Sequence, residues 1–382
     1  MLRLMVLNFF LQASVSAISP YTQILLRNKG YSHSVVGVIV AVGQVASIFF
    51  PILFGMVSDR TRRTRILAVA LALGTAVAFV PTALSGSMAV TVVSFFVASA
   101  LFWSINPMND GYENRVLGGD SSKYGVVRAM GTLGYLLCLV LFAVTGFPNE
   151  TDNRSITLCV VISLVLFCVA VAFAPKDEPR AEGGARKPGA AFSFSWFSSK
   201  FYLMMLVVAL TRIGEAVIDK LLSSYMTEEL HLGGDFALFV ALGAASEFVM
   251  MVVGGRLMQK GRIRAYGLIV VSAVGMIARF LIYRFIPTLP AFVVAQLLHS
   301  CTFGALHIGV SKFIAQNVDE SHYSLGMSFY WAIATNLPEM LGVLAGGFVI
   351  DNFGYGTLFA SYTVFPALAL AICLANRRRL AD

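Results

Sequence analysis

The sequence GMVSDRTRRTR at residues 55–65 has a counterpart, GRLMQKGRIR, at residues 255–264, and each segment follows a long apolar run. Three pairs of residues match at an offset of 200 positions: Gly55 with Gly255, Arg60 with Lys260, and Arg62 with Arg262. The same offset superposes the apolar runs on either side of the two segments. The chain is therefore predicted to be a parallel duplication, in which two similar halves follow one another.

The apolar runs indicate a membrane protein. Of the 382 residues, 58% are hydrophobic and only 13% are charged, a balance unlike that of soluble globular domains. A helix of about 20 apolar residues spans the hydrocarbon core of a bilayer. The sequence predicts an all-α membrane protein with twelve transmembrane helices in two pseudo-symmetric six-helix bundles, at residues 4–26, 35–58, 66–84, 88–114, 124–147, 155–174, 201–226, 236–255, 265–283, 290–311, 323–350 and 354–375.

The basic residues predict the orientation of the chain. An even number of spans places both termini on one side of the membrane. With both termini in the cytoplasm, most of the 28 Lys and Arg residues fall on inner segments, which is the usual bias of membrane proteins. The net charge of +8 thus reflects topology, and no nucleic-acid partner is expected. We expect a monomer in a cell membrane, the bacterial inner membrane in particular, in contact with membrane lipid.

One polar stretch, rich in Pro, Gly and charge, divides the chain. The predicted domains are an N-terminal bundle at residues 1–175, a cytoplasmic linker at 176–199 and a C-terminal bundle at 200–382. The five cysteines fall within predicted spans and lack the spacing of metal ligands. Neither a nucleophile elbow nor a phosphate-binding loop is found. We therefore expect no enzyme activity, no metal and no cofactor.

The stretch DGYENRVLGGDSSKYGVVR, residues 110–128, places charges where hydrocarbon is expected. Asp110 and Arg128 each lie nine residues from position 119, in the predicted glycine turn. Equal separation from the turn of a helical hairpin means equal depth, about 13 Å at about 1.5 Å per residue, so the two side chains are predicted to pair. Glu113 is expected one turn nearer the inner surface on a similar face, and Tyr135 two turns beyond Arg128. A guanidinium beside an aromatic ring suits a polar, ring-bearing substrate; a purely structural ion pair is the alternative.

The C-terminal half carries a second set of charges at matching depth. Glu247 and Arg279 lie 15 to 16 residues from the turn that joins their predicted helices, and His299 is about nine residues into the next span. Burial favours the neutral carboxyl and a nearby cation favours the ionised one, so protonation of such a group is switchable. A proton-handling triad is predicted; a hydrogen-bonded core histidine is the alternative for His299.

Two further sets of charges lie within predicted spans. Arg212, Glu215 and Asp219 follow the spacing i, i+3, i+7 along one helical stripe, so that they neutralise one another in part, and Lys220 follows them. Glu339 is expected either to pair with Lys220 or Arg212, or to serve as a second protonation site.

The loop after the second span resembles the signature loop of the major facilitator superfamily, which Gly55, Asp59, Arg60 and Arg63 approximate. This resemblance covers the whole chain and implies a gating role for the loop. It also implies a secondary active transporter in which two six-helix bundles enclose a midplane cavity and work by alternating access.

Within that superfamily, the residues from Asp110 through Tyr124-Gly125-Val-Val-Arg128 to Tyr135 resemble the oligosaccharide:proton symporter group, which includes lactose permease. They are also similar to predicted phenylpropionate permeases, as is QLLHSCTFGALHIG at residues 296–309. The resemblance implies that Asp110 and Arg128 bind substrate and that Tyr135 replaces a stacking tryptophan. Glu247 would link substrate to proton coupling, in which Arg279 and His299 take part.

The sequence departs from that group at three positions. Thr302 stands where a carboxylate is expected, Gln296 where a lysine is expected before the histidine, and Ala334 where a lysine is expected in the eleventh span. Glu247 or Glu339 is then left to carry a proton.

The leading hypothesis is a proton-coupled symporter of a small polar or aromatic solute, such as a sugar, a nucleoside or an aromatic acid, driven by the proton gradient. A proton-driven exporter of drugs or metabolites on the same fold is the first alternative. A membrane receptor that transports nothing is the second.

Overall fold

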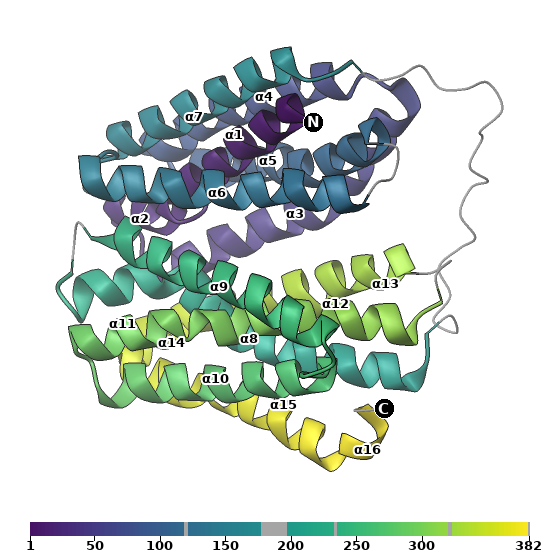
Figure 1. The fold of residues 1–382 in the computed structure, drawn as a ribbon. Helices are drawn as coiled ribbons and strands as arrows, with labels where there is room; N and C mark the ends of the chain where they lie inside the picture. The colour runs from purple at the N-terminus through teal and green to yellow at the C-terminus, as the bar shows by residue number, and fades with distance from the viewer. Residues whose placement is uncertain (118–120, 177–196, 233–234, 320–322, 381–382) are drawn as a thin grey trace. The chain divides into compact units, whose positions relative to one another are not determined.

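The computed structural model describes residues 1–117, 121–176, 197–232, 235–319 and 323–380. Among these residues, eleven segments are long and apolar enough to cross a membrane. The last of them, Gly326–Ala375, has 50 residues and would extend about 75 Å as one helix, enough for two crossings. Gly354, the first residue of the predicted span 354–375, interrupts it with a φ of 76°. The described part of the chain thus contains the predicted twelve spans and is built from helices (Figure 1).

The chain separates into two units, one of residues 1–31 and 42–191, the other of 32–41 and 192–382. Most of the predicted linker, residues 177–196, lies outside the described residues. The first unit contains α1 (Leu2–Ile18), α2 (Tyr21–Asn28), most of α3 (His33–Thr61), α4 (Thr64–Leu84), α5 (Met88–Val116), α6 (Ser121–Thr145) and α7 (Asn153–Phe173).

Small residues allow the helices of the first unit to approach closely. α1 packs against α6 and α7, and α4 packs against α5 and α7 (Figure 1). A side chain at Gly134 of α6 would collide with the Phe9 carbonyl of α1, and one at Gly131 would meet the Asn8 side chain. This contact needs glycine because association between membrane helices depends on close packing. It also brings the polar side chains of α1 into the interior of the unit.

The second unit contains the remaining helices and two π-helical segments. Its elements are α8 (Ser199–Glu228), α9 (Phe236–Gln259), α10 (Ala265–Phe285), α11 (Leu289–Leu297), η2 (Ser300–Gly304), α12 (Ala305–Asn317), α13 (Tyr323–Phe329), η4 (Tyr330–Asn336), α14 (Leu337–Tyr362), α15 (Val364–Ala375) and α16 (Arg377–Leu380).

α8 lies at the centre of this unit, against α14, α15 and η4. A Cβ atom at Gly342 of α14 would lie 2.5 Å from the Ile213 carbonyl oxygen of α8, so α14 also uses glycine for a close approach. The π-helices interrupt the tenth and eleventh spans at the level where these spans face α8, α9 and α10.

Candidate functional site

The predicted pair between Asp110 and Arg128 is present in the first unit. The Arg128 Nη1 donates to Asp110 Oδ1 at 2.8 Å, and the two side chains are 45% and 32% exposed. The Tyr124 hydroxyl also hydrogen-bonds Asp110. The predicted turn at residues 118–119 lies outside the described residues.

Glu113 has partners that its position in the hairpin does not predict. Its carboxylate is fully buried and accepts hydrogen bonds from Asn8 Nδ2, at 2.9 and 2.8 Å to its two oxygens, and from Asn109 Nδ2 at 2.7 Å. A further amide pair, Gln12 to Asn106 at 3.0 Å, connects the same two helices. Glu113 is therefore anchored by amides between α1 and α5, not by the exposed guanidinium of Arg128. The spacing of Asn8 and Gln12, one turn apart, indicates that both amides face inward, but it does not show which residue they meet.

Tyr135 lies half-buried on α6, two turns beyond Arg128. Its position on the helix agrees with the predicted stripe.

The predicted triad of the second unit is assembled around His299. The His299 Nε2 lies 3.5 Å from Glu247 Oε2 on α9, and its Nδ1 lies 3.2 Å from Arg279 Nη1 on α10. Arg279 is fully buried and also donates to Thr302 Oγ1 at 3.0 Å and to the Tyr283 hydroxyl at 3.3 Å. Thr302 thus accepts one hydrogen bond from the guanidinium. A carboxylate at that position would also have neutralised its charge.

A second ion-pair group adjoins this triad. Arg212 on α8 contacts both Glu215, one turn away, and Glu339 on α14. All three side chains are buried. Of the two partners proposed for Glu339, the structure thus shows Arg212. The His299 Nδ1 lies 4.0 Å from Glu215 Oε1, which joins the two groups into one network.

Asp219 and Lys220 lie at the edge of this network. Ligand atoms of Glu215, Asp219 and His299 lie within 4.8 Å of one another, close enough to share a metal ion. Arg212 and Arg279, however, already contact Glu215 and His299, so a metal ion would face two guanidinium groups. This donor set fits proton and ion-pair exchange better than metal binding. Lys220 is half-buried beside the exposed Asp219.

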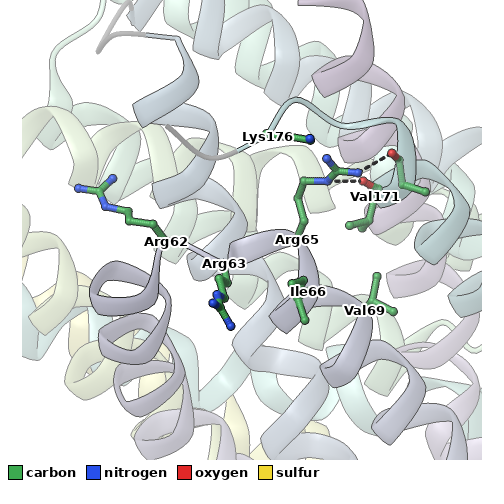
Figure 2. A pocket seen from close by; sticks show the side chains of 8 residues that line it. Arg62, Arg63, Arg65, Ile66, Val69, Val171 and Lys176 are labelled. Atoms are coloured by element: carbon green, nitrogen blue, oxygen red, sulfur yellow. Dashed lines mark hydrogen bonds between the residues drawn. The ribbon is translucent and has the colours of Figure 1, made fainter. Parts of the chain in front are cut away.

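The basic loop of the first unit surrounds a cavity of about 470 Å³. Arg65 donates through Nε to the Val171 carbonyl at 3.1 Å and through Nη2 to the Ala172 carbonyl at 2.5 Å, at the end of α7 (Figure 2). Arg62 and Arg63 point away from Arg65 in different directions (Figure 2). Cations that point in different directions cannot bind one anion together. Arg65 instead caps the end of α7. The side chain of Asp59 lies outside the described part of the structure, and Gly55 and Arg60 lie at the end of α3.

The first residues of α3 belong to the second unit and bind two acids that the sequence did not single out. Asp351 on α14 accepts from the backbone N–H groups of His33 and Ser34, at 3.0 and 2.7 Å. The His33 Nε2 lies 3.1 Å from Glu228 Oε2 on α8, and the Tyr355 hydroxyl donates to the same oxygen at 3.1 Å. Asp351 thus caps α3 from a distant part of the chain, an arrangement that no local motif predicts.

Comparison with known proteins places the chain among transporters. The MFS_1 like family matches residues 1–361. The chain is 24% identical to the maltose permease of Geobacillus stearothermophilus, over 98% of this chain and 94% of that protein. It is 23% identical to the probable 3-phenylpropionic acid transporter of Escherichia coli (strain K12), over 92% of each protein. A crystal structure of the nucleoside transporter NupG superposes with a TM-score of 0.78 at 15% identity, over 100% of this chain and 99% of that one.

The resemblance inferred from the loop and hairpin motifs is confirmed by these matches, and the fold agrees with the all-helical, two-bundle prediction. The relatives are transporters rather than enzymes. The chain belongs to the MFS_1 like family and is a multi-pass membrane transporter of the major facilitator superfamily.

Proposed function

We propose that this protein is a proton-coupled symporter that moves a small polar or aromatic solute by alternating access. The observation that carries the proposal is the network around His299, which joins Glu247 on one side to Arg279 and Glu215 on the other. Charged groups inside a membrane domain are costly, and they mark substrate or ion pathways. The names of the relatives support the solute class, since they include transporters of maltose, 3-phenylpropionic acid and nucleosides.

Proton coupling follows from the alternatives open to Glu247. An ionised Glu247 attracts a protonated His299. A neutral Glu247 does not, and the imidazole then interacts with Arg279 and Glu215 instead. A proton on Glu247 therefore changes which partners His299 keeps, and this couples occupancy of the site to the arrangement of α9, α10 and α8. Arg279 holds the imidazole in reach of both carboxylates. Glu339 is the second candidate for protonation, because its release would free Arg212.

Solute binding is assigned to the exposed pair of the first unit. Asp110 accepts and Arg128 donates hydrogen bonds, and both side chains remain partly open. Tyr135 offers a ring on the same helix as Arg128. Glu247, with 22% of its side chain exposed, is proposed to link bound solute to proton movement. Glu113 is proposed to support Asp110 indirectly, because both of its own oxygens already accept hydrogen bonds from amides.

The basic loop after α3 is proposed to lie on the cytoplasmic side, with both termini. Its cations Arg60 and Arg63 are exposed and would contact the phosphate groups of lipid, while Gly55 and Asp59 act in gating. Charge-reversal variants of this loop combined with labelling of either terminus would test the orientation.

The test uses purified protein in liposomes that contain a pH-sensitive dye. Solute added outside should carry protons inward and acidify the lumen. Movement of protons in the opposite direction would identify an exporter, and solute movement without protons would identify a uniporter. Glu247→Gln should separate solute binding from proton movement.

A further inference from the structure

A row of aromatic rings extends from the proton-handling network through the second unit. His299, Phe303 and His307 follow one another at intervals of four residues. The rings of His299 and Phe303 are 5.9 Å apart with an interplanar angle of 17°, and those of Phe303 and His307 are 6.0 Å apart at 11°. Three nearly parallel rings thus share one face of the tenth span.

The row continues onto the eleventh span. His307 lies 6.0 Å from the ring of Tyr330 and 5.5 Å from that of Trp331, and its Nδ1 is 3.3 Å from the Tyr330 hydroxyl. Tyr330 is fully buried, Phe303 and His307 are half-buried, and Trp331 is 39% exposed. The row therefore has a buried base and an open end.

Both π-helical segments carry members of this row. Phe303 belongs to η2, and Tyr330 and Trp331 begin η4. A π-helix widens the turn and redirects side chains, at a cost in helix geometry, and it is frequent at functional sites. Two such segments on different spans supply rings that meet at His307.

A buried cation flanks the row. The Arg212 guanidinium carbon lies 5.0 Å from the centroid of Phe303. The same guanidinium contacts Glu215 and Glu339. The ring faces therefore lie directly beside the network proposed to handle the proton.

We propose that Phe303, His307 and Trp331 form a stacking site for an aromatic ring of the transported solute. This inference rests on the proposed function and selects, among its solutes, aryl acids and nucleosides over plain sugars. A solute ring extends the existing row at its open Trp331 end, with the 5–6 Å spacing that the protein's own rings show. A sugar can pack on a single ring, but it depends on hydrogen bonds to its several hydroxyls, whereas a row of ring faces favours a planar aromatic ring.

The test follows the fluorescence of Trp331 in the full-length protein. The chain has three tryptophans, so Trp103→Phe with Trp196→Phe leaves Trp331 as the reporter. The purified protein is titrated with 3-phenylpropionate and other aryl carboxylates, with uridine and adenosine, and with maltose. An aryl acid or a nucleoside should change the fluorescence of Trp331, and maltose should not.

Affinity is then measured by thermal shift in single variants of the wild-type protein, without the two Trp→Phe changes used for fluorescence. Phe303→Ala and Trp331→Ala should each weaken binding of the aromatic solute by about 10-fold to 100-fold, the usual effect of removing one stacking ring. Trp331→Phe should restore most of it. Phe348→Ala is the matched control, because Phe348 is a 57% exposed ring on α14 and should leave affinity unchanged.

Two results would overturn the stacking site. One is binding of maltose but of no aromatic solute, or of none of these solutes; the other is unchanged affinity for the aromatic solute in both alanine variants. Failure of the symport mechanism would look different, because an aromatic solute would then bind with the predicted ring dependence but move no protons.

Discussion

The Arg212 guanidinium on α8 contacts the Glu339 carboxylate on α14, 127 positions later in the chain, and both side chains are buried. Glu215 contacts the other side of the same guanidinium. One cation thus contacts two carboxylates inside an apolar unit. When both are ionised, one negative charge is left over, and the gain of one proton removes it.

Removal of Glu339 should destabilise the protein less than removal of Arg212. Arg212→Ala leaves two buried carboxylates without their cation and should cost about 3–5 kcal/mol, the usual effect of breaking a buried pair. Glu339→Gln keeps a hydrogen-bonding group and one carboxylate per cation. Thermal unfolding in detergent measures both, and an equal loss in the two variants would contradict the shared-cation arrangement.

Asn8→Ala should lower the free energy of unfolding by about 1–3 kcal/mol, because it removes a donor to each oxygen of the buried Glu113. The control is Asn352→Ala, an exposed residue whose amide donates to the Phe348 carbonyl of its own helix. Combining Asn8→Ala with Glu113→Ala should cost less than the sum of the two single variants. Simple additivity in that double-mutant cycle would show that the two side chains do not act together.

Arg65→Ala should destabilise the end of α7 by about 1–3 kcal/mol, since the guanidinium donates to two carbonyls there. Arg65→Lys should recover only part of this, because an ammonium lacks the planar fork of the guanidinium. Arg63→Ala is the matched control, with the same charge change in an exposed neighbour. Equal unfolding temperatures for the Arg63 and Arg65 variants would contradict the capping role.

Asp351→Ala should cost about 0.5–2 kcal/mol, the range for loss of a helix cap, since this carboxylate accepts from two N–H groups at the start of α3. Asp351→Asn should retain most of the stability, because an amide oxygen still accepts. Hydrogen exchange at His33 and Ser34 reports the cap directly, and unchanged protection in Asp351→Ala would show that the cap has no effect.

The sequence was sufficient to predict contacts between residues that lie at equal depth on neighbouring helices. Asp110 and Arg128 lie at equal distances from one turn, and Glu247 and Arg279 from another, so counting residues along straight helices located both sets. Counting fails where the helix is not regular. η2 begins directly after His299 and η4 spans residues 330–336, and each changes the register of the residues that follow. Glu339 therefore kept two possible partners until the structure placed it on Arg212.

Contacts between helices that are distant in the chain could not be predicted from the sequence. Glu113 is bound by Asn8, 105 positions away, and the packing of α1 against α6 through Gly131 and Gly134 positions that amide. Asp351 reaches His33 over 318 positions. The spacing of polar residues shows that such groups face inward, but helix packing decides which of them meet.

The most direct test of proton coupling is solute-driven proton movement in liposomes that contain either the wild-type protein or Glu247→Gln. The wild-type protein should acidify the lumen when solute enters. The Glu247→Gln protein should still exchange solute between the two sides of the membrane while proton movement falls to the background of empty liposomes. Proton movement at the wild-type rate in Glu247→Gln, with the same dependence on external pH, would contradict the account.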